Sequence, residues 1–197
     1  AWLDAIGVAD AVFVGHDLGG GVAQIAAVRR PERCAGLVLV NSIGYDSWPI
    51  PSVKAMRVTG PVVERIPAGL FRPVFAGFLR LGHDNVTVAG ESIAVHWRPY
   101  AETGGPRGFV RQIRSLRTQD TLAVADRLPG LQVPARVVWG AADQFQKVRY
   151  GERLAADLGA DLTRLTGARH FVPEDHPEPV AEATAAVLTE WHGGKSV

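Results

Sequence analysis

The chain has 197 residues, of which 47% are hydrophobic and 21% charged, which is typical of a folded globular protein and excludes a largely disordered chain. Its 21 Lys and Arg residues nearly balance 20 Asp and Glu residues, so there is no basic excess to suggest a nucleic-acid partner. The single cysteine, Cys34, excludes an intrachain disulfide and a multi-cysteine zinc site, and no apolar run reaches the roughly 20 residues that span a membrane.

The first nine residues, AWLDAIGVA, are typical of the end of an amphipathic helix that leads into a strand. The chain does not begin with methionine, and its one Met is Met56. We therefore expect an N-terminally truncated fragment or a processed product, with any signal peptide lying upstream. The compartment stays open, with a cytoplasmic location favoured, and the oligomeric state stays open as well.

Residues 11–41 combine strand and helix patterns. The apolar run AVFVG at 11–15 predicts a buried strand, and small and apolar residues at helical spacing follow from Leu18 until Pro31 stops them. The run CAGLVLVN at 34–41 predicts a second buried strand. Two continuously apolar strands joined by a helix predict an α/β fold whose mainly parallel sheet is flanked by helices.

The next stretch is predicted to be a helical insertion between two strands. It has little strand pattern, and eight prolines divide it. Short helices are expected near 52–65, 69–81, 85–97, 106–118 and 121–128. We therefore expect a helical cap over 44–130, between a first core part at 1–43 and a second at 131–197.

The last stretch returns to alternating strands and helices. Strands are expected at 134–140 (PARVVWG) and 160–167 (ADLTRLTG), with helices at 147–158 and 177–191. The tail GGKSV is expected to be mobile.

The glycine-rich turn GHDLGG at 15–20 joins the first strand to the first long helix. Asp17 at its apex is expected to stand above the sheet, because glycines on both sides let strand, turn and helix approach closely. The helix N-terminus behind it is expected to keep the carboxylate ionised and exposed. The alternative is a simple helix N-cap. A phosphate loop is not favoured, because the Lys-Ser/Thr pair and the G-x-G-x-x-G spacing are missing.

Two further polar residues follow later strands. Asp143 ends VVWGAAD, and His170 lies in GARHF after the next strand. Each could be an ordinary loop residue. Because the carboxyl ends of parallel strands meet at one edge of a sheet, we expect Asp17, Asp143 and His170 to converge there in the order nucleophile, acid, histidine.

The chain resembles the aspartate-nucleophile branch of the α/β-hydrolase superfamily, which includes haloalkane dehalogenases, haloacid-type dehalogenases and epoxide hydrolases. The motifs GHDLGG, VVWGAAD and GARHFVPEDHPEPV carry the resemblance. It covers the whole chain, and the helical stretch matches the family's cap in position. It implies that the backbone N–H of Leu18 forms half of an oxyanion hole. The other half belongs to an upstream loop with a His-Gly motif, so the fragment itself is expected to be inactive.

An aspartate nucleophile predicts a particular chemistry. A carboxylate is already anionic and suits displacement at a saturated carbon that bears a halide or an epoxide oxygen, which leaves an alkyl ester on the enzyme. His170 would then deprotonate water, while Asp143 would hold its tautomer. The expected partners are a small apolar organic substrate and water, with no cofactor. The alternatives are an esterase-like relative and a non-catalytic small-molecule-binding relative.

The leaving group stays open, with a slight preference for an epoxide. Haloalkane dehalogenases have Trp after the nucleophile, where this chain has Leu18. Fluoroacetate-type enzymes place arginines there, and this chain has none. Epoxide hydrolases use cap tyrosines as acids, which makes Tyr45 and Tyr100 candidates. The candidate halide donors are Trp48 and Trp97. For each of these four residues the alternative, a packing residue in the core or at the surface, is the favoured interpretation.

Other polar residues are interpreted as structural. His16 is expected to point away from the site, because successive strand residues alternate between faces. Arg107, Arg111 and Arg114 are expected to form a solvated helix face. His83, His176 and His192 have no metal-ligand partners at useful spacing, so no metal site is expected.

Overall fold

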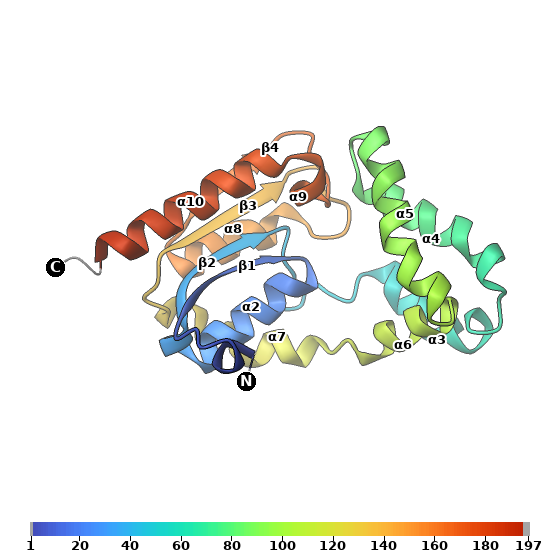
Figure 1. The fold of residues 1–197 in the computed structure, drawn as a ribbon, viewed down its shortest axis with the longest axis horizontal. Coiled ribbons are helices and arrows are strands. Elements are labelled where there is room, and N and C mark those ends of the chain that lie inside the picture. The colour runs from blue at the N-terminus through green and yellow to red at the C-terminus, as the bar shows by residue number, and fades with distance from the viewer. Residues whose placement is uncertain (1, 195–197) are drawn as a thin grey trace.

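The computed structural model describes residues 2–194. Its centre is a parallel four-stranded sheet in the order β1 (Ala11–His16), β2 (Cys34–Val40), β3 (Ala135–Gly140) and β4 (Asp161–Leu165). The predicted α/β fold with a parallel sheet is confirmed. All four strands point the same way, so their carboxyl ends lie along one edge (Figure 1).

Helices connect and cover the strands. A short helix, α1 (Trp2–Ala5), precedes β1, and α2 (Leu18–Arg29) with the 3-10 turn η1 (Pro31–Arg33) joins β1 to β2. Between β2 and β3 lie α3 (Pro51–Val63), α4 (Ala68–Gly82), α5 (Val86–Glu102), α6 (Pro106–Ser115), α7 (Thr118–Ala125) and the 3-10 turn η2 (Leu128–Gly130). The helix α8 (Val148–Leu158) joins β3 to β4, and α9 (Val172–Asp175) and α10 (Pro177–Gly194) follow β4.

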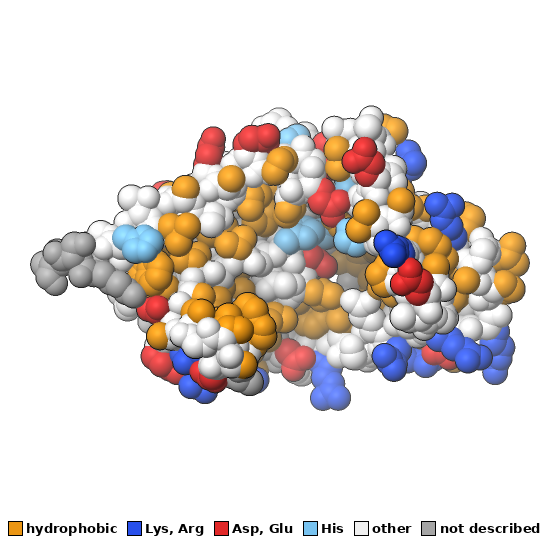
Figure 2. Space-filling view, viewed as in Figure 1, with side chains coloured by type: hydrophobic (Ala, Val, Ile, Leu, Met, Phe, Trp, Pro, Cys, Tyr) orange, Lys and Arg blue, Asp and Glu red, His pale blue; other side chains and the backbone are white. Residues whose placement is uncertain are grey.

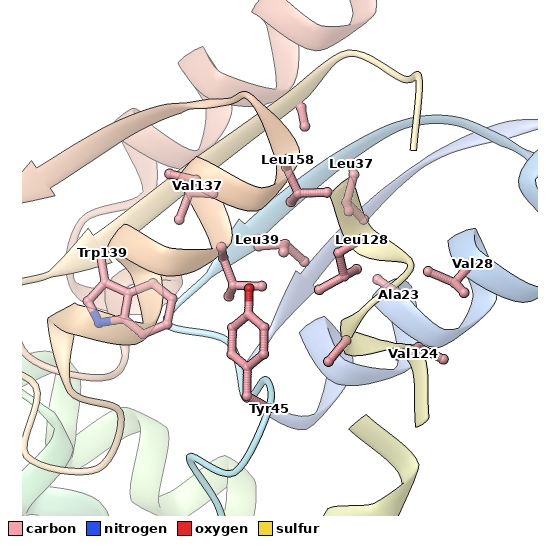
Figure 3. Close-up of a cluster of buried hydrophobic side chains, with 14 residues drawn as sticks. Ala23, Val28, Leu37, Leu39, Tyr45, Val124, Leu128, Val137, Trp139 and Leu158 are labelled. Atoms are coloured by element: carbon pink, nitrogen blue, oxygen red, sulfur yellow. The ribbon is translucent and has the colours of Figure 1, made fainter. Parts of the chain in front are cut away.

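The two faces of the sheet are buried under different helices. Leu37 and Leu39 of β2 belong to the larger core cluster, together with residues of α2, α7 and α8 (Figure 3). Val38 and Val40, one residue out of step, pack on the other face against Val187 of α10. Every residue of β2 is buried, and burying one such side chain contributes about 1.5–3 kcal/mol. This two-sided burial explains why the strand is apolar without alternation.

The helices α3 to α6 form a separate lobe beyond the sheet (Figure 1). An aromatic cluster centred on Phe71 and Phe75 joins α4 to α5 and α6, and Phe171 from the loop after β4 packs on it. By contrast, Val124 of α7 and Leu128 of η2 pack in the core cluster with β2. The division at 44–130 stays a prediction.

Several local predictions differ from the structure. The first helix covers only Trp2–Ala5. The helix expected to end at 97 continues through Pro99 to Glu102. Packing of Phe75 against Trp97 and Tyr100 continues across that proline, and such tertiary contacts can outweigh its helix penalty of about 3 kcal/mol.

Two further differences concern helix ends. The helix expected over 106–118 ends at Ser115, and the one expected over 121–128 covers Thr118–Ala125. Gly193 and Gly194 of the expected mobile tail are the last residues of α10, and residues 195–197 lie outside the described part. No helix within residues 2–194 is long and apolar enough to cross a membrane.

Candidate active site

The turn after β1 has the geometry that its glycines permit. Asp17 lies there with φ +48° and ψ −117°, a strained conformation for a residue with a side chain. A Cβ on Gly15 would lie 2.6 Å from the carbonyl oxygen of Gly19, and one on Gly20 would lie 2.0 Å from Ser42 Oγ. Strand, turn and helix therefore approach each other at distances that only glycine allows.

The Asp17 side chain does not cap α2, because it makes no capping hydrogen bond. It is 34% exposed, so the carboxylate is partly exposed. Burial raises the pKa of this carboxyl above its ordinary value, against the opposing effects of the positive charge on His170 and the N–H of Leu18. Desolvation is the largest of these effects, and the negative charge of Asp143 raises the pKa further.

His170 lies between the two predicted carboxylates. Its Nδ1–H donates to Asp143 Oδ2 at 2.8 Å, and its Nε2 is 3.8 Å from Asp17 Oδ1. Burial lowers the pKa of His170, but the hydrogen bond to Asp143 and the charges of both carboxylates outweigh it, and the net shift is upward. The three residues predicted to converge at the strand ends do so in the structure.

Asp143 is buried and held by donors from three directions. Its Oδ1 accepts from the N–H groups of Phe145 at 2.7 Å and Gln146 at 3.1 Å. Its Oδ2 accepts from His170 and, at 2.6 Å, from Asn41 Nδ2. Burial alone raises the pKa of Asp143, but these hydrogen bonds and the charge of His170 bring it below the ordinary value.

Asn41 is a site residue that the sequence analysis missed. It follows β2 with φ +39°, its Oδ1 accepts from the Gly140 N–H at 3.0 Å, and it is fully buried. Its place directly after an apolar strand is the same signal that singled out Asp143. Asn41 was not singled out from the sequence, because its side chain is an uncharged amide and not an acid or a base.

The helical lobe holds the loop that carries His170. The carbonyl of Gly82, at the end of α4, accepts from the N–H groups of His170 at 2.8 Å and Phe171 at 3.0 Å. The next residue, His83, donates from Nδ1 to Asp175 at 2.9 Å and stacks on Phe171 with ring centroids 4.3 Å apart.

The prediction for His16 is wrong. Its Nε2–H donates to the carbonyl oxygen of His170 at 2.9 Å, and the two rings lie 4.7 Å apart. The alternation of side chains between the two faces of a strand does not determine where the His16 ring points. The strand ends at His16, and the backbone turns sharply at the next residue. Burial and the charge of His170 lower the pKa of His16 to about 4.

A cavity of about 350 Å³ opens above Asp17 and His170. Its floor includes Leu18, Ile43 and Phe145 from loops at the sheet edge, and its roof comes from helices α3 to α6. Apolar side chains make up most of the lining. Histidine and acidic side chains gather near the middle of the face shown in Figure 2, between the sheet and the lobe.

A sequence model described as the alpha/beta hydrolase family matches residues 1–183. The chain belongs to this family. This α/β hydrolase is 29% identical over 189 residues to the uncharacterized hydrolase YugF of Bacillus subtilis, a match that covers 93% of the chain and 67% of YugF.

Two other curated relatives differ in the reaction that they are named for. Epoxide hydrolase 4 of Mus musculus is 24% identical over 95% of the chain and 56% of its own length. Haloalkane dehalogenase 2 of Mycobacterium tuberculosis is 26% identical over 92% of the chain and 65% of its own length. The chain thus spans little more than half of the first and about two thirds of the second.

A solved structure of an α/β hydrolase fold protein from Burkholderia ambifaria has the same fold. The two superpose with a TM-score of 0.82 at 24% identity, over 95% of this chain and 68% of that one.

Of the four predicted substrate-binding residues in this hydrolase, two line the cavity. Tyr100 lines it and donates its hydroxyl hydrogen to Gln112 at 2.6 Å. Trp48 lines it as well, but its indole N–H donates to Thr121 at 2.7 Å. These polar groups therefore already have partners in the protein.

The other two lie elsewhere, so the structure contradicts their prediction as substrate contacts. Tyr45 is buried in the core beside Leu39 and Trp139 (Figure 3), and its hydroxyl donates to Asp157. Trp97 packs against Phe71 and Phe75 in the aromatic cluster and is not part of the cavity wall. The positions of Tyr45 and Trp97 in the sequence do not determine whether their rings point into the cavity or into the core.

The histidines outside the cavity contact carboxylates in pairs. His83 contacts Asp175, and His176 contacts Asp84 at 2.9 Å. Within residues 2–194, no group of three or more His, Cys, Asp and Glu side chains is arranged to hold a metal ion.

Proposed function

We propose that this α/β hydrolase opens an epoxide of a small, mainly apolar substrate through a covalent ester on Asp17, with Asp17, Asp143 and His170 as its catalytic residues. The observation that carries the proposal is the position of His170. It is hydrogen-bonded to Asp143 on one side and 3.8 Å from Asp17 on the other, at the floor of an apolar cavity. A carboxylate held there reacts as a nucleophile without losing a proton.

In the first step, a carboxylate oxygen of Asp17 attacks an epoxide carbon. A C–O ester bond forms, the ring C–O bond breaks, and the freed oxygen takes a proton. Tyr100 is the candidate donor, because its ring faces the cavity. Its O–H must turn from Gln112 to the substrate for this transfer.

In the second step, His170 Nε2 takes a proton from water and the oxygen of that water attacks the carbonyl carbon of Asp17. Asp143 keeps Nε2 of His170 free by accepting from Nδ1, and stabilises the cation that forms. The N–H of Leu18 faces the developing oxyanion, where one donor contributes about 3–4 kcal/mol. Collapse of the intermediate expels the alkoxide, which takes the remaining proton of the attacking water and leaves as a vicinal diol, and it restores the Asp17 carboxylate. The proton on His170 passes through solvent to the Tyr100 phenolate, which completes the cycle.

Carbon–halogen cleavage is the second candidate, because the same ester would form with loss of a halide. A halide leaving group needs N–H donors in the cavity. Of the two that the sequence suggested, Trp48 donates to Thr121, and Trp97 lies outside the cavity wall. This arrangement favours the epoxide.

The helical segment 44–130 is proposed to act as a cap. Its helices α3 to α6 roof the cavity and exclude water from the first step, when water would compete with Asp17. The cap also contacts the His170 loop directly through Gly82.

Intact mass of a His170→Gln variant of the complete gene product tests the proposal. The ester should form and persist, because no base activates water. After incubation with epoxides, haloalkanes and haloacids, an adduct of the whole substrate mass indicates an epoxide hydrolase, and one lacking hydrogen halide indicates a dehalogenase.

Two variants control this experiment. His192→Gln, an exposed position on α10, should turn over substrate without accumulating an adduct. Asp17→Asn combined with His170→Gln should form none. If His170→Gln forms no adduct with any epoxide or halide, the proposal is wrong and a non-catalytic binding protein becomes the better interpretation.

A further inference from the structure

Gln146 differs from the other polar side chains that line the cavity. His16, Trp48, His96, Tyr100 and Gln112 each have a hydrogen-bond partner within the protein. Gln146 lines the same cavity and is 3% exposed, yet its Oε1 has no hydrogen-bond partner among the described residues. A buried acceptor left unpaired destabilises a fold, so such a group calls for a functional reason.

The N–H and the carbonyl of Gln146 are both hydrogen-bonded within the protein, which fixes the main chain of this residue. Its N–H donates to Asp143 Oδ1 at 3.1 Å, and its carbonyl accepts from the indole N–H of Trp139 at 3.0 Å. Trp139 is fully buried. The amide is thus carried by a residue that is anchored to the candidate acid and to the core.

The neighbouring residue places this amide close to the reacting groups. Phe145 contacts the ring of His170 edge-on at 5.1 Å and stacks on Phe78 of α4 at 4.8 Å. Phe145 and Gln146 both line the cavity, two and three residues after Asp143 in the chain.

We infer that Gln146 binds a hydroxyl group of the substrate, so that the natural substrate is an epoxide that also carries an alcohol. The amide Oε1 is itself buried, so the side chain turns toward the cavity for Oε1 to accept from the substrate O–H, and the amide N–H₂ can donate to the hydroxyl oxygen. The surrounding apolar wall takes the hydrocarbon part. This inference rests on the proposed function and names the substrate class for that site.

The test compares matched substrates. We would measure kcat/KM of the complete gene product for a series of epoxyalkanols, with the hydroxyl one to three carbons from the ring, and for epoxyalkanes of equal chain length. The wild type should prefer one epoxyalkanol by roughly three- to tenfold, as expected for one neutral hydrogen bond. Gln146→Leu should lose that preference, whereas Gln119→Leu, at an exposed position on α7, should keep it.

A second readout does not need turnover. Calorimetric titration with the triol produced from the preferred substrate should show weaker binding to Gln146→Leu than to wild type. If Gln146→Leu does not fold, Gln146→Met is used for both measurements. Equal kcat/KM for both substrate types in the wild type, or an unchanged preference in the variant, would overturn the inference and leave the amide with bound water only.

The two proposals fail in different ways. If epoxyalkanes and epoxyalkanols react equally and their turnover depends on Asp17, the inference fails while the proposed function stands. If neither forms an adduct on His170→Gln, the proposed function fails. Triol binding that depends on Gln146 would then still support the hydroxyl site.

Discussion

The main-chain N–H of His170 donates to the carbonyl oxygen of Gly82 at 2.8 Å. This bond joins the candidate general base, after the last strand, to the end of a helix in the lobe that roofs the cavity. A Cβ on Gly82 would lie 2.6 Å from the ring of Phe171, so the approach depends on the missing side chain. The helical lobe that roofs the cavity therefore also holds His170, the candidate general base, in position.

The buried pair beside this bond should matter for both stability and activity. The side chains of His83 and Asp175 are each 1% exposed, and Asp175 also accepts from the N–H of Asp84. Asp175→Asn should lower the free energy of unfolding by about 1–3 kcal/mol, the cost of impairing buried hydrogen bonds. It should lower kcat more than it raises KM, because His170 loses its support. Denaturant unfolding and steady-state kinetics measure both effects.

The matched control for that variant is Glu102→Gln. Glu102 pairs with Arg98 at side-chain exposures of 62% and 79%, and such a surface pair contributes about 0–1 kcal/mol. It should change neither stability nor kinetics appreciably. Equal losses in the two variants would show that the buried pair has no special role.

Two glycines of the Asp17 turn should respond oppositely to the same substitution. Gly15→Ala places a Cβ 2.6 Å from main-chain atoms of Gly19 and Gly20, which cannot move without shifting the turn. It should destabilise the protein severely or prevent folding. Gly19→Ala meets nothing within 4 Å and lies in the first turn of α2, so it should be neutral or stabilising by up to about 1 kcal/mol. Thermal unfolding of both variants is the measurement, and tolerance of Gly15→Ala would contradict the close approach of strand and helix at this turn.

The side chain of Asn41 should be needed to orient Asp143. Asn41→Gly keeps the positive φ available and removes the three hydrogen bonds of the amide, to Asp143, Gly140 and the carbonyl of Arg169. We expect kcat to fall by about tenfold or more and the free energy of unfolding to fall by about 1.5–3 kcal/mol, since one bond is to a charged group. Asn41→Ala should lose further stability because a Cβ is strained at φ +39°. Wild-type kcat in Asn41→Gly would show that Asp143 is held well enough by its other donors.

The two neighbouring histidines, His16 and His170, should have widely different pKa values. The pKa of His170 is raised above its ordinary 6.5, and that of His16 is lowered to about 4. NMR titration of labelled histidines should therefore show His170 protonated at pH values where His16 is neutral. Asp17→Asn should lower the pKa of His170 by removing a charge 3.8 Å away, and Asp143→Asn should lower it further by removing a charged acceptor as well.

The upward shift of the His170 pKa determines how activity should fall at acidic pH. His170 takes a proton from water in the second step only when it is neutral, so a raised pKa moves the loss of kcat on acidification to higher pH. The raised pKa of Asp17 acts in the same direction, because only its ionised form attacks. If His170 titrates below 6.5 in the free protein, the assigned roles of the two carboxylates would need revision.

Local sequence pattern was sufficient for the sheet and for three site residues. Continuous apolar runs at 11–15, 34–41 and 134–140 predict buried strands, because a strand covered on both faces has no polar side. All three are strands, but only β2 and β3 are buried: β1 is at the edge of the sheet, and its Val14 is 48% exposed. Asp17, Asp143 and His170 follow strands directly, and the parallel direction of the strands brings such positions to one edge. The three residues converge because each follows a strand of the same parallel sheet within a few residues. The glycines and the strand spacing that produce this arrangement can be recognised in the local sequence.

Tertiary structure alone decided which other side chains reach the cavity. Tyr45 and Tyr100 are equivalent candidates in sequence, but the first points into the core and the second into the cavity. The Asn41–Asp143 bond and the Gly82–His170 bond each join residues about 90 or more positions apart. Such pairs arise from how separately folded segments pack, and no local spacing specifies the direction of a side chain across that distance.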